Sequence, residues 1–492
     1  MTGKEARNDK VLQNIVLRFL EEGLNMSREA LDLLSKAKEP MKLAERVLSM
    51  IEKNKERPMF ITPEYIKSVM EVPPVAVEIS SPVQPSEDWD LAKAESQRMT
   101  HGLHPYPARM LPQIAEKLIK RYLIESLPPP HDRYTVLDPF CGSGTVLVEC
   151  KRLGVNSIGN DINPLAILLA KVKANPIHPV KLDEGVTSFL KSVREDIART
   201  RSRELKVKSP NFPNIHHWFK DYVINELQTI RQNIEKINDA NLRDFFKVCF
   251  SLTVMNTSNV DQHSSRFIRV LPEERLKRHK PNVLTTFNDI TIDSAKRVSS
   301  FYNICSNAWV NVIEGDARKL PLRNESVDLI VTSPPYGEEK NTVAYTRWSK
   351  LSLYWLGYEQ DAIKTLEKAS LGRGKGSIWT PSETANKVLN EVSKYEKERA
   401  LEAAPFFHDY QESIREMHRV LKKGSYCCIV IGNRSIRRIA LDMEKVTVEL
   451  GSTVGFKHVK TYYRNIPKKL IPWTTPTGNT IAYENIVVLS KG

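Results

Sequence analysis

A glycine-rich turn between a strand and a helix, at residues 135–149, most constrains the fold. Thr135-Val136-Leu137 has the apolar, β-branched character of a buried strand, and Val146 opens a helix. Between them, Gly142 and Gly144 let backbone amides approach a ligand at the helix N-terminus. This is the usual cofactor- or anion-binding geometry of a doubly wound sheet. Alone, such a turn also fits a nucleotide site or close helix packing.

A carboxylate follows the glycine turn at a suitable distance. Asp161 ends a second short strand, Ser157 to Asn160, about 20 residues after the glycines. A carboxylate there suits the two hydroxyls of a ribose. The alternative is that Asp161 caps the helix that begins near Pro164.

A third stretch, Thr332 to Gly337, reads TSPPYG and follows the buried run Val327 to Val331. Two successive prolines prevent the strand from continuing, so the chain turns away stiffly. The turn offers the hydroxyl of Ser333, free carbonyls and the aromatic face of Tyr336. These groups suit a planar base with an exocyclic amine, although SPPY alone also fits a surface turn.

Together these stretches resemble the motifs of the S-adenosylmethionine-dependent DNA amino-methyltransferases. Residues 138–145 (DPFCGSGT) resemble the cofactor motif, residues 160–163 the ribose-binding motif, and TSPPY the catalytic motif. Residues 101–110 resemble the motif that holds the methionine end of the cofactor, and residues 315–318 the motif whose acid meets the adenine. Five short motifs in compatible order make a specific signal, which runs from about residue 101 to the C-terminus with insertions.

The resemblance implies a Rossmann-like class I methyltransferase sheet with S-adenosylmethionine as cofactor. It assigns cofactor binding to His104, Tyr106, Asp138, Phe140, Gly142, Gly144, Asp161 and Asp316. It assigns catalysis to Ser333, Pro334, Pro335 and Tyr336.

The implied reaction is direct methyl transfer to an amine of a base flipped out of duplex DNA. Tyr336 would stack on the base, while Ser333 and the carbonyl of Pro334 accept hydrogen bonds from the amine. In the family SPPY goes mostly with cytosine N4, which is the predicted target. Many cytosine-N4 enzymes carry the catalytic motif first, and the opposite order here keeps adenine N6 open.

Three other functions fit the chain less well. Guanine-N2 RNA methyltransferases share a similar cofactor loop and end their catalytic strand with DPPYG; Gly337 fits them, whereas Ser333 does not. A non-catalytic DNA-binding relative would not need both motifs intact. Cytosine C5 methylation requires a cysteine nucleophile in a Pro-Cys pair, and the chain contains no such dipeptide.

The 492 residues predict two or three domains. We expect a helical module over 1–70, a proline-rich linker over 71–91, and a methyltransferase domain in two halves, 92–179 and 308–492. Between the halves, residues 180–307 form an insertion with helical periodicity and a basic run, which predicts DNA recognition. The basic side chains expected at DNA are Arg266, Arg269, Arg275, Lys277, Arg278, Lys280, Arg373 and Lys375.

Composition agrees with a DNA partner. The formal charge is +14 and the pI about 9.3, which favours a polyanion. The six cysteines show no CxxC or metal-ligand spacing, so we expect reduced thiols and no metal. Neither a signal peptide nor an apolar run of membrane-spanning length is present, which predicts a cytoplasmic protein. A restriction endonuclease sharing its DNA site would be a natural partner.

Overall fold

The computed structural model describes residues 28–35, 43–44, 47, 89–91, 94–261, 270–338, 342–437, 439–466, 474–475, 478–479 and 483–492. In the N-terminal module it describes the helix α2 (Arg28–Ser35), in which Ala30 and Leu34 are buried as their spacing predicts. The remainder of that module and most of the linker lie outside the described residues. Arg266 and Arg269 of the basic run do so as well.

A seven-stranded sheet with the order β3-β2-β1-β4-β5-β11-β8 forms the centre of the molecule. Its first five strands are parallel, and β11 runs antiparallel to both β5 and β8. This confirms the predicted doubly wound, Rossmann-like sheet, and the structure adds an antiparallel end to it. The strands are β1 (Thr135–Asp138), β2 (Asn156–Asp161), β3 (Val310–Glu314), β4 (Val327–Thr332), β5 (Leu421–Gly432), β8 (Phe456–Asn465) and β11 (Tyr483–Lys491).

Helices cover both faces of this sheet because successive strand residues point to opposite sides. On one face, Val136 packs with α5 (Pro112–Ile119) and α6 (Thr145–Leu153). On the other face, Leu137 belongs to a core formed with α16 (Glu383–Ser393), α17 (Lys397–Val420) and α18 (Met443–Thr453). With both faces covered, the central strand β4 is mostly apolar and is buried at every position.

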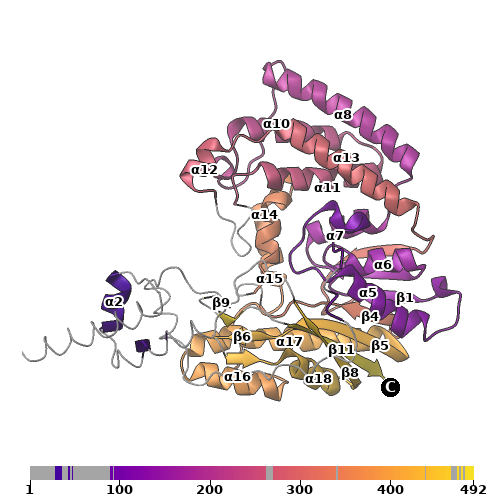
Figure 1. Cartoon of the computed structure of the whole chain (residues 1–492), viewed down its shortest axis with the longest axis vertical. Coiled ribbons are helices and arrows are strands. Elements are labelled where there is room, and N and C mark those ends of the chain that lie inside the picture. The colour runs from indigo at the N-terminus through magenta and orange to yellow at the C-terminus, as the bar shows by residue number, and fades with distance from the viewer. Residues whose placement is uncertain are drawn as a thin grey trace, which may run out of the picture.

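The insertion between α7 (Pro164–Ala174) and β3 is helical, as predicted, and Figure 1 shows its long helices gathered at one end of the molecule. Its core continues into α7 and α14 (Tyr345–Trp355) of the methyltransferase domain: Trp355 meets the rings of Phe219 and Phe250 edge-on. The insertion is therefore packed onto the sheet domain through these two helices. Its helices are α8 (Pro179–Arg201), α9 (Ile215–Trp218), α10 (Asp221–Glu235), α11 (Ala240–Thr257), α12 (Glu273–Arg278) and α13 (Val283–Tyr302).

Smaller elements complete the chain. The helix α15 (Gln360–Ala369) follows α14, and two short pairs of strands, β6 (Arg434–Ile436) with β7 (Ile439–Leu441) and β9 (Thr474–Thr475) with β10 (Gly478–Asn479), lie outside the main sheet. Within the described part of the chain, no helix has both the length and the apolar character needed to cross a bilayer.

Candidate active site

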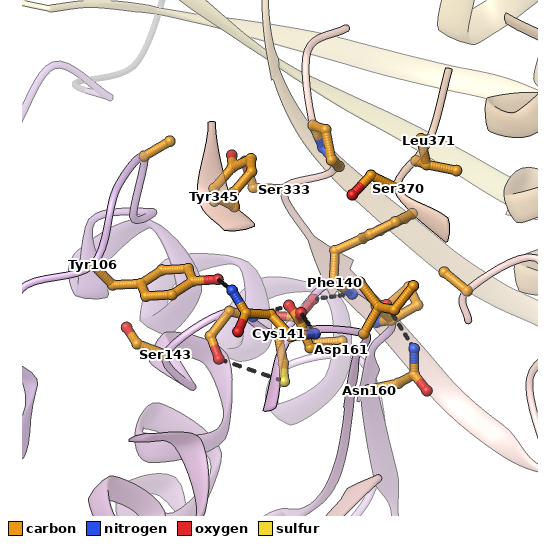
Figure 2. Close-up of a pocket in the computed structure, with 18 of the residues that line it drawn as sticks. Tyr106, Phe140, Cys141, Ser143, Asn160, Asp161, Ser333, Tyr345, Ser370 and Leu371 are labelled. Carbon is orange, nitrogen blue, oxygen red and sulfur yellow. Dashed lines mark hydrogen bonds between the residues drawn. The ribbon is translucent and has the colours of Figure 1, made fainter. Parts of the chain in front are cut away.

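The glycine turn and the TSPPYG turn meet at the carboxyl edge of the sheet, where β1 and β4 lie side by side. The chain reverses its winding direction between these two strands, and ligands of doubly wound sheets bind at that position. A cavity of about 1030 Å³, open solvent at its mouth included, lies there (Figure 2). Its walls include Phe140, Gly142, Asp161, Asp316 and Ser333.

The two glycines of the turn are required by geometry. Gly142 and Gly144 have φ angles of +47° and +85°, in the left-handed region that favours glycine. A Cβ on Gly144 would lie 2.8 Å from the Cα of Ala170, and one on Gly142 would lie 3.2 Å from the ring of Tyr106. Gly144 stands at the N-cap of α6, so the turn carries backbone amides at the start of a helix into the cavity wall.

Asp161 holds the glycine turn against the next loop. Its carboxylate accepts hydrogen bonds from the backbone N–H groups of Gly142 at 2.9 Å and Asn163 at 2.8 Å. The helix cap considered as an alternative for Asp161 is instead Asn163, whose side chain accepts from the amide of Leu165. Burial raises the pKa of Asp161 to about 6.

Asp138 joins the two motifs directly. One of its carboxylate oxygens accepts from the hydroxyl of Thr332 at 2.7 Å and from the amide of Phe140 at 3.1 Å. Thr332 is the last residue of β4, so this contact sets the spacing between the glycine turn and the catalytic turn. Burial raises the pKa of Asp138 to about 7.

The catalytic turn presents only part of its surface to the cavity. Ser333, Pro335 and Gly337 line it, whereas Pro334 is buried and is not among the described wall residues. Tyr336 is partly buried against the core under α17, and its hydroxyl lies 3.5 Å from the Ser333 hydroxyl and donates to Glu484 at 3.1 Å.

A buried ion cluster fixes the end of this turn. Glu338, which is 2% exposed, forms ion pairs with Arg434 of β6 and Arg399 of α17. These guanidinium groups lower the pKa of Glu338 to about 2 against the opposing effect of burial. Arg434 also reaches the carbonyl of Tyr336 at 3.4 Å, so the cluster ties the turn to two distant elements.

Comparison with known proteins identifies the family. The family model of a DNA methylase, N6/N4 type, matches residues 18–172 and 327–492. The Type II methyltransferase M.MvaI of Kocuria varians is 33% identical over 417 residues, which cover 80% of this chain and 90% of that protein. The chain belongs to the N6/N4 DNA methylase family. Its activity is S-adenosylmethionine-dependent methylation of DNA, and the predictions of that activity and of the cofactor are confirmed.

The chain also has more distant similarities. M.MjaII of Methanocaldococcus jannaschii, also a Type II methyltransferase, is 24% identical over 51% of this chain and 62% of that protein. The rRNA methyltransferase aviRa of Streptomyces viridochromogenes matches with 12% identity and a TM-score of 0.29 over 82% of this chain and 94% of that one. A second family model, for D12 class N6 adenine-specific DNA methyltransferases, matches residues 117–355.

The cavity of this DNA methylase has unpaired polar atoms that suit S-adenosylmethionine. The Oγ of Ser143 and the Oδ1 of Asn160 are buried, belong to residues of the cavity wall and have no hydrogen-bond partner in the described structure. Buried polar atoms without partners are rare in native proteins and indicate a missing ligand or water. The carboxylate of Asp161 and the amides of the glycine turn complete a set of groups able to hold a ribose and a charged amino-acid end.

Of the other residues predicted to bind the cofactor, Tyr106 lines the cavity and His104 does not. Tyr106 lines the cavity and stacks on Tyr345, with ring centroids 6.0 Å apart. His104 is not in the described lining: it is fully buried, with its ring nitrogens at Pro105 O (2.6 Å) and Ser251 Oγ (3.0 Å). Residues 106–110, further along the same motif, line the cavity.

Asp316 does line the cavity, but its carboxylate is engaged by a neighbour. Arg318 donates to both oxygens, at 2.7 to 3.0 Å, and also pairs with Asp409 of α17. Arg318 therefore competes with any amine for the acceptors of Asp316. An adenine amine would have to donate to the lone pairs of Asp316 that the Arg318 guanidinium does not occupy.

Sequence reasoning missed several wall residues. Tyr345 and Thr346 open α14, Ala369 ends α15, and Ser370 and Leu371 follow it. All five line the cavity, and Figure 2 labels Tyr345, Ser370 and Leu371 among its wall residues. An aromatic residue eight positions after Gly337 was the available signal for Tyr345. The segment 369–371 carries no motif, and its position depends on distant contacts such as the hydrogen bond from Arg318 to the carbonyl of Ala369 at 2.9 Å.

Some of the basic residues that we predict to contact DNA form ion pairs with acidic side chains. Arg275 lies 3.6 Å from Asp261, and Lys277 lies 2.7 Å from Glu273 on α12. Lys375 forms an ion pair with Glu398. Arg278 and Lys280 are exposed, and Arg373 is half-buried. Exposed surface pairs are weak, so phosphate groups can displace the acidic partners.

Proposed function

We propose that this DNA methyltransferase modifies the N4 amine of cytosine in duplex DNA. The observation that carries the proposal is Ser333, a neutral hydroxyl at the end of β4 that lines the cavity next to the cofactor loop. Asp or Asn at this position goes mostly with adenine N6 in the family, whereas Ser goes mostly with cytosine N4.

The chain's own groups perform three tasks in the proposed mechanism. The turn accepts hydrogen bonds from the target amine through Ser333 Oγ and the Pro334 carbonyl, which draws the nitrogen lone pair out of conjugation. Tyr336 stacks on the flipped base. The walls hold S-adenosylmethionine, which supplies an electrophilic methyl group when bound, and positioning provides much of the rate.

No covalent intermediate is needed, and the cavity favours none. Cys141 lines the cavity, but burial, with the nearby charges of Asp161 and Asp138, raises the pKa of its thiol well above the usual value. A thiol held in its protonated form is a poor nucleophile. This supports amine methylation over C5 chemistry.

A second candidate is adenine-N6 methylation. The match to the adenine-specific D12 class over residues 117–355 favours it, and the order of the motifs is compatible with it. The two candidates share every step except the identity of the base, so a single measurement separates them.

The proposed function predicts N4-methylcytosine in substrate DNA. Duplex DNA incubated with the protein and S-adenosylmethionine is digested to nucleosides and analysed by mass spectrometry. N4-methylcytosine as the product supports the proposal, and N6-methyladenine supports the second candidate. Unmodified DNA with a folded, cofactor-binding protein would contradict both.

We further propose that the insertion grips DNA through the basic segment that contains Arg278 and Lys280. Replacing both by glutamine should reduce the slope of log affinity against log salt concentration by about two, because each lost phosphate contact reduces it by roughly one. Lys423→Gln is the matched control, since this exposed lysine lies at the amino end of β5 and therefore at the opposite edge of the sheet from the site. An unchanged slope in the double variant would place DNA elsewhere.

A further inference from the structure

The hydroxyl of Tyr336 lies in a chain of polar groups that leads away from the cavity. It is 3.5 Å from Ser333 Oγ on one side and donates to Oε1 of Glu484 at 3.1 Å on the other. The second oxygen of Glu484 forms an ion pair with Arg464. Glu484 and Arg464 are cross-strand neighbours on β11 and β8, and Arg464 is 7% exposed. The catalytic turn is thus connected to a charge pair built into the sheet.

This charge pair fixes the direction of the hydrogen bond made by Tyr336. An ionised carboxylate can only accept, so the phenol must be the donor. Burial and the nearby charge of Glu484 raise the pKa of Tyr336 well above its usual value, which keeps the phenolic proton in place. With its single proton committed to Glu484, the oxygen of Tyr336 is left as an acceptor.

This arrangement also determines which way the hydroxyl proton of Ser333 points. A hydroxyl has one proton to donate and two lone pairs that accept. If Ser333 gives its proton to Tyr336, both lone pairs remain for the cavity, where the target amine must be met by acceptors. A Ser333 proton pointing into the cavity would instead face the N–H groups of the amine. The present separation of 3.5 Å is long, as catalytic hydrogen bonds often are before substrate binds.

We propose that Glu484, held by Arg464, is a positioning residue that sets Ser333 as a hydrogen-bond acceptor through the hydroxyl of Tyr336. The proposal rests on the proposed function, because it assigns a partner to the residue that accepts from the target amine. Glu484 itself touches neither base nor cofactor in this scheme. The alternative is that Glu484 and Arg464 form a cross-strand ion pair that only stabilises the sheet.

Glu484→Gln tests which groups donate in the hydrogen bonds from Ser333 through Tyr336 to Glu484, with little change in side-chain shape. Arg464 attracts the amide oxygen, so the amide N–H₂ turns toward Tyr336, which can then no longer donate there. We expect kcat for methyl transfer to fall about tenfold, the effect of one hydrogen bond to a charged group. KM for DNA should stay within about twofold, since the stacking ring of Tyr336 is retained.

Tyr336→Phe removes the hydroxyl and keeps the ring, so it should lower kcat to a similar extent. The combination Tyr336→Phe with Glu484→Gln is decisive. If Glu484 acts through the hydroxyl, the double variant has the kcat of Tyr336→Phe alone. A structural role of Glu484 predicts instead that its substitution lowers stability and leaves kcat per folded molecule unchanged in either background.

The opposite face of the same strands provides a matched control. Tyr463 of β8 donates to Glu444 of α18 at 3.1 Å, the same kind of contact away from the cavity. Glu444→Gln should leave kcat unchanged. Wild-type kcat in both Glu484→Gln and Tyr336→Phe would overturn the positioning role while the proposed function stands. Failure of the proposed function appears separately, as the absence of a methylated amine in the wild-type nucleoside analysis.

Discussion

Replacing Tyr336 by alanine should lower methyl transfer to DNA between about fivefold and 150-fold while leaving cofactor affinity unchanged. The range corresponds to about 1–3 kcal/mol, the typical contribution of one aromatic side chain stacked on a base. Cofactor affinity should survive because Tyr336 is not among the residues of the cavity wall that hold it. Transfer of labelled methyl groups to duplex DNA and titration calorimetry with S-adenosylmethionine measure the two quantities.

Stability must be measured alongside activity, because the ring of Tyr336 also packs against the core under α17. Thermal melting gives the folded fraction, and Tyr463→Ala controls for the loss of a tyrosine–glutamate contact elsewhere in the sheet. Ser333→Ala should have a smaller effect than Tyr336→Ala, since the Pro334 carbonyl still accepts from the amine. Full activity per folded molecule in Tyr336→Ala would remove the proposed base-binding site.

The fold was predictable where local pattern and packing agree. The apolar runs at Val136 and Val327 could be assigned to buried parallel strands because both faces of the sheet are covered. The sequence pattern predicts a helix only from Phe406 onward, but α17 begins at Lys397 and contains Pro405. A proline removes an amide donor, so it is read as a helix start or break. Packing of Ala400, Ala403 and Ala404 in the core extends the helix beyond it.

The site was predictable to the extent that its residues are consecutive in the chain. Residues of the glycine turn and of TSPPYG share a cavity because each turn follows a parallel strand at the same sheet edge. The partners that hold these turns are not local. Glu338 meets Arg399 and Arg434, and Tyr336 meets Glu484. Since these pairs are separated by 61 to 148 residues, no periodicity or spacing in the sequence indicates them.

Adding a single methyl group at Gly337 should greatly reduce both stability and methyl transfer. A Cβ there would lie 1.6 Å from Nη1 of Arg434 and 2.4 Å from its Cζ. Arg434 cannot simply move away, because it is 8% exposed and forms an ion pair with Glu338. Breaking a buried ion pair costs about 3–5 kcal/mol. We therefore expect Gly337→Ala to lose several kcal/mol of unfolding free energy and nearly all methyl transfer, measured by urea denaturation and labelled-methyl assay.

A matched substitution and a double-mutant cycle identify the cause. Gly376→Ala introduces the same methyl group where the nearest atom, Cγ of Pro405, is 3.2 Å away, and it should cost far less. If the clash with Arg434 is responsible, Gly337→Ala should add little destabilisation in an Arg434→Ala background, where the nearest remaining contact is Cγ2 of Thr342 at 3.0 Å. Equal losses in the two backgrounds would assign the loss to the contact with Thr342 instead. The turn would then hold Ser333 in place without the help of Arg434.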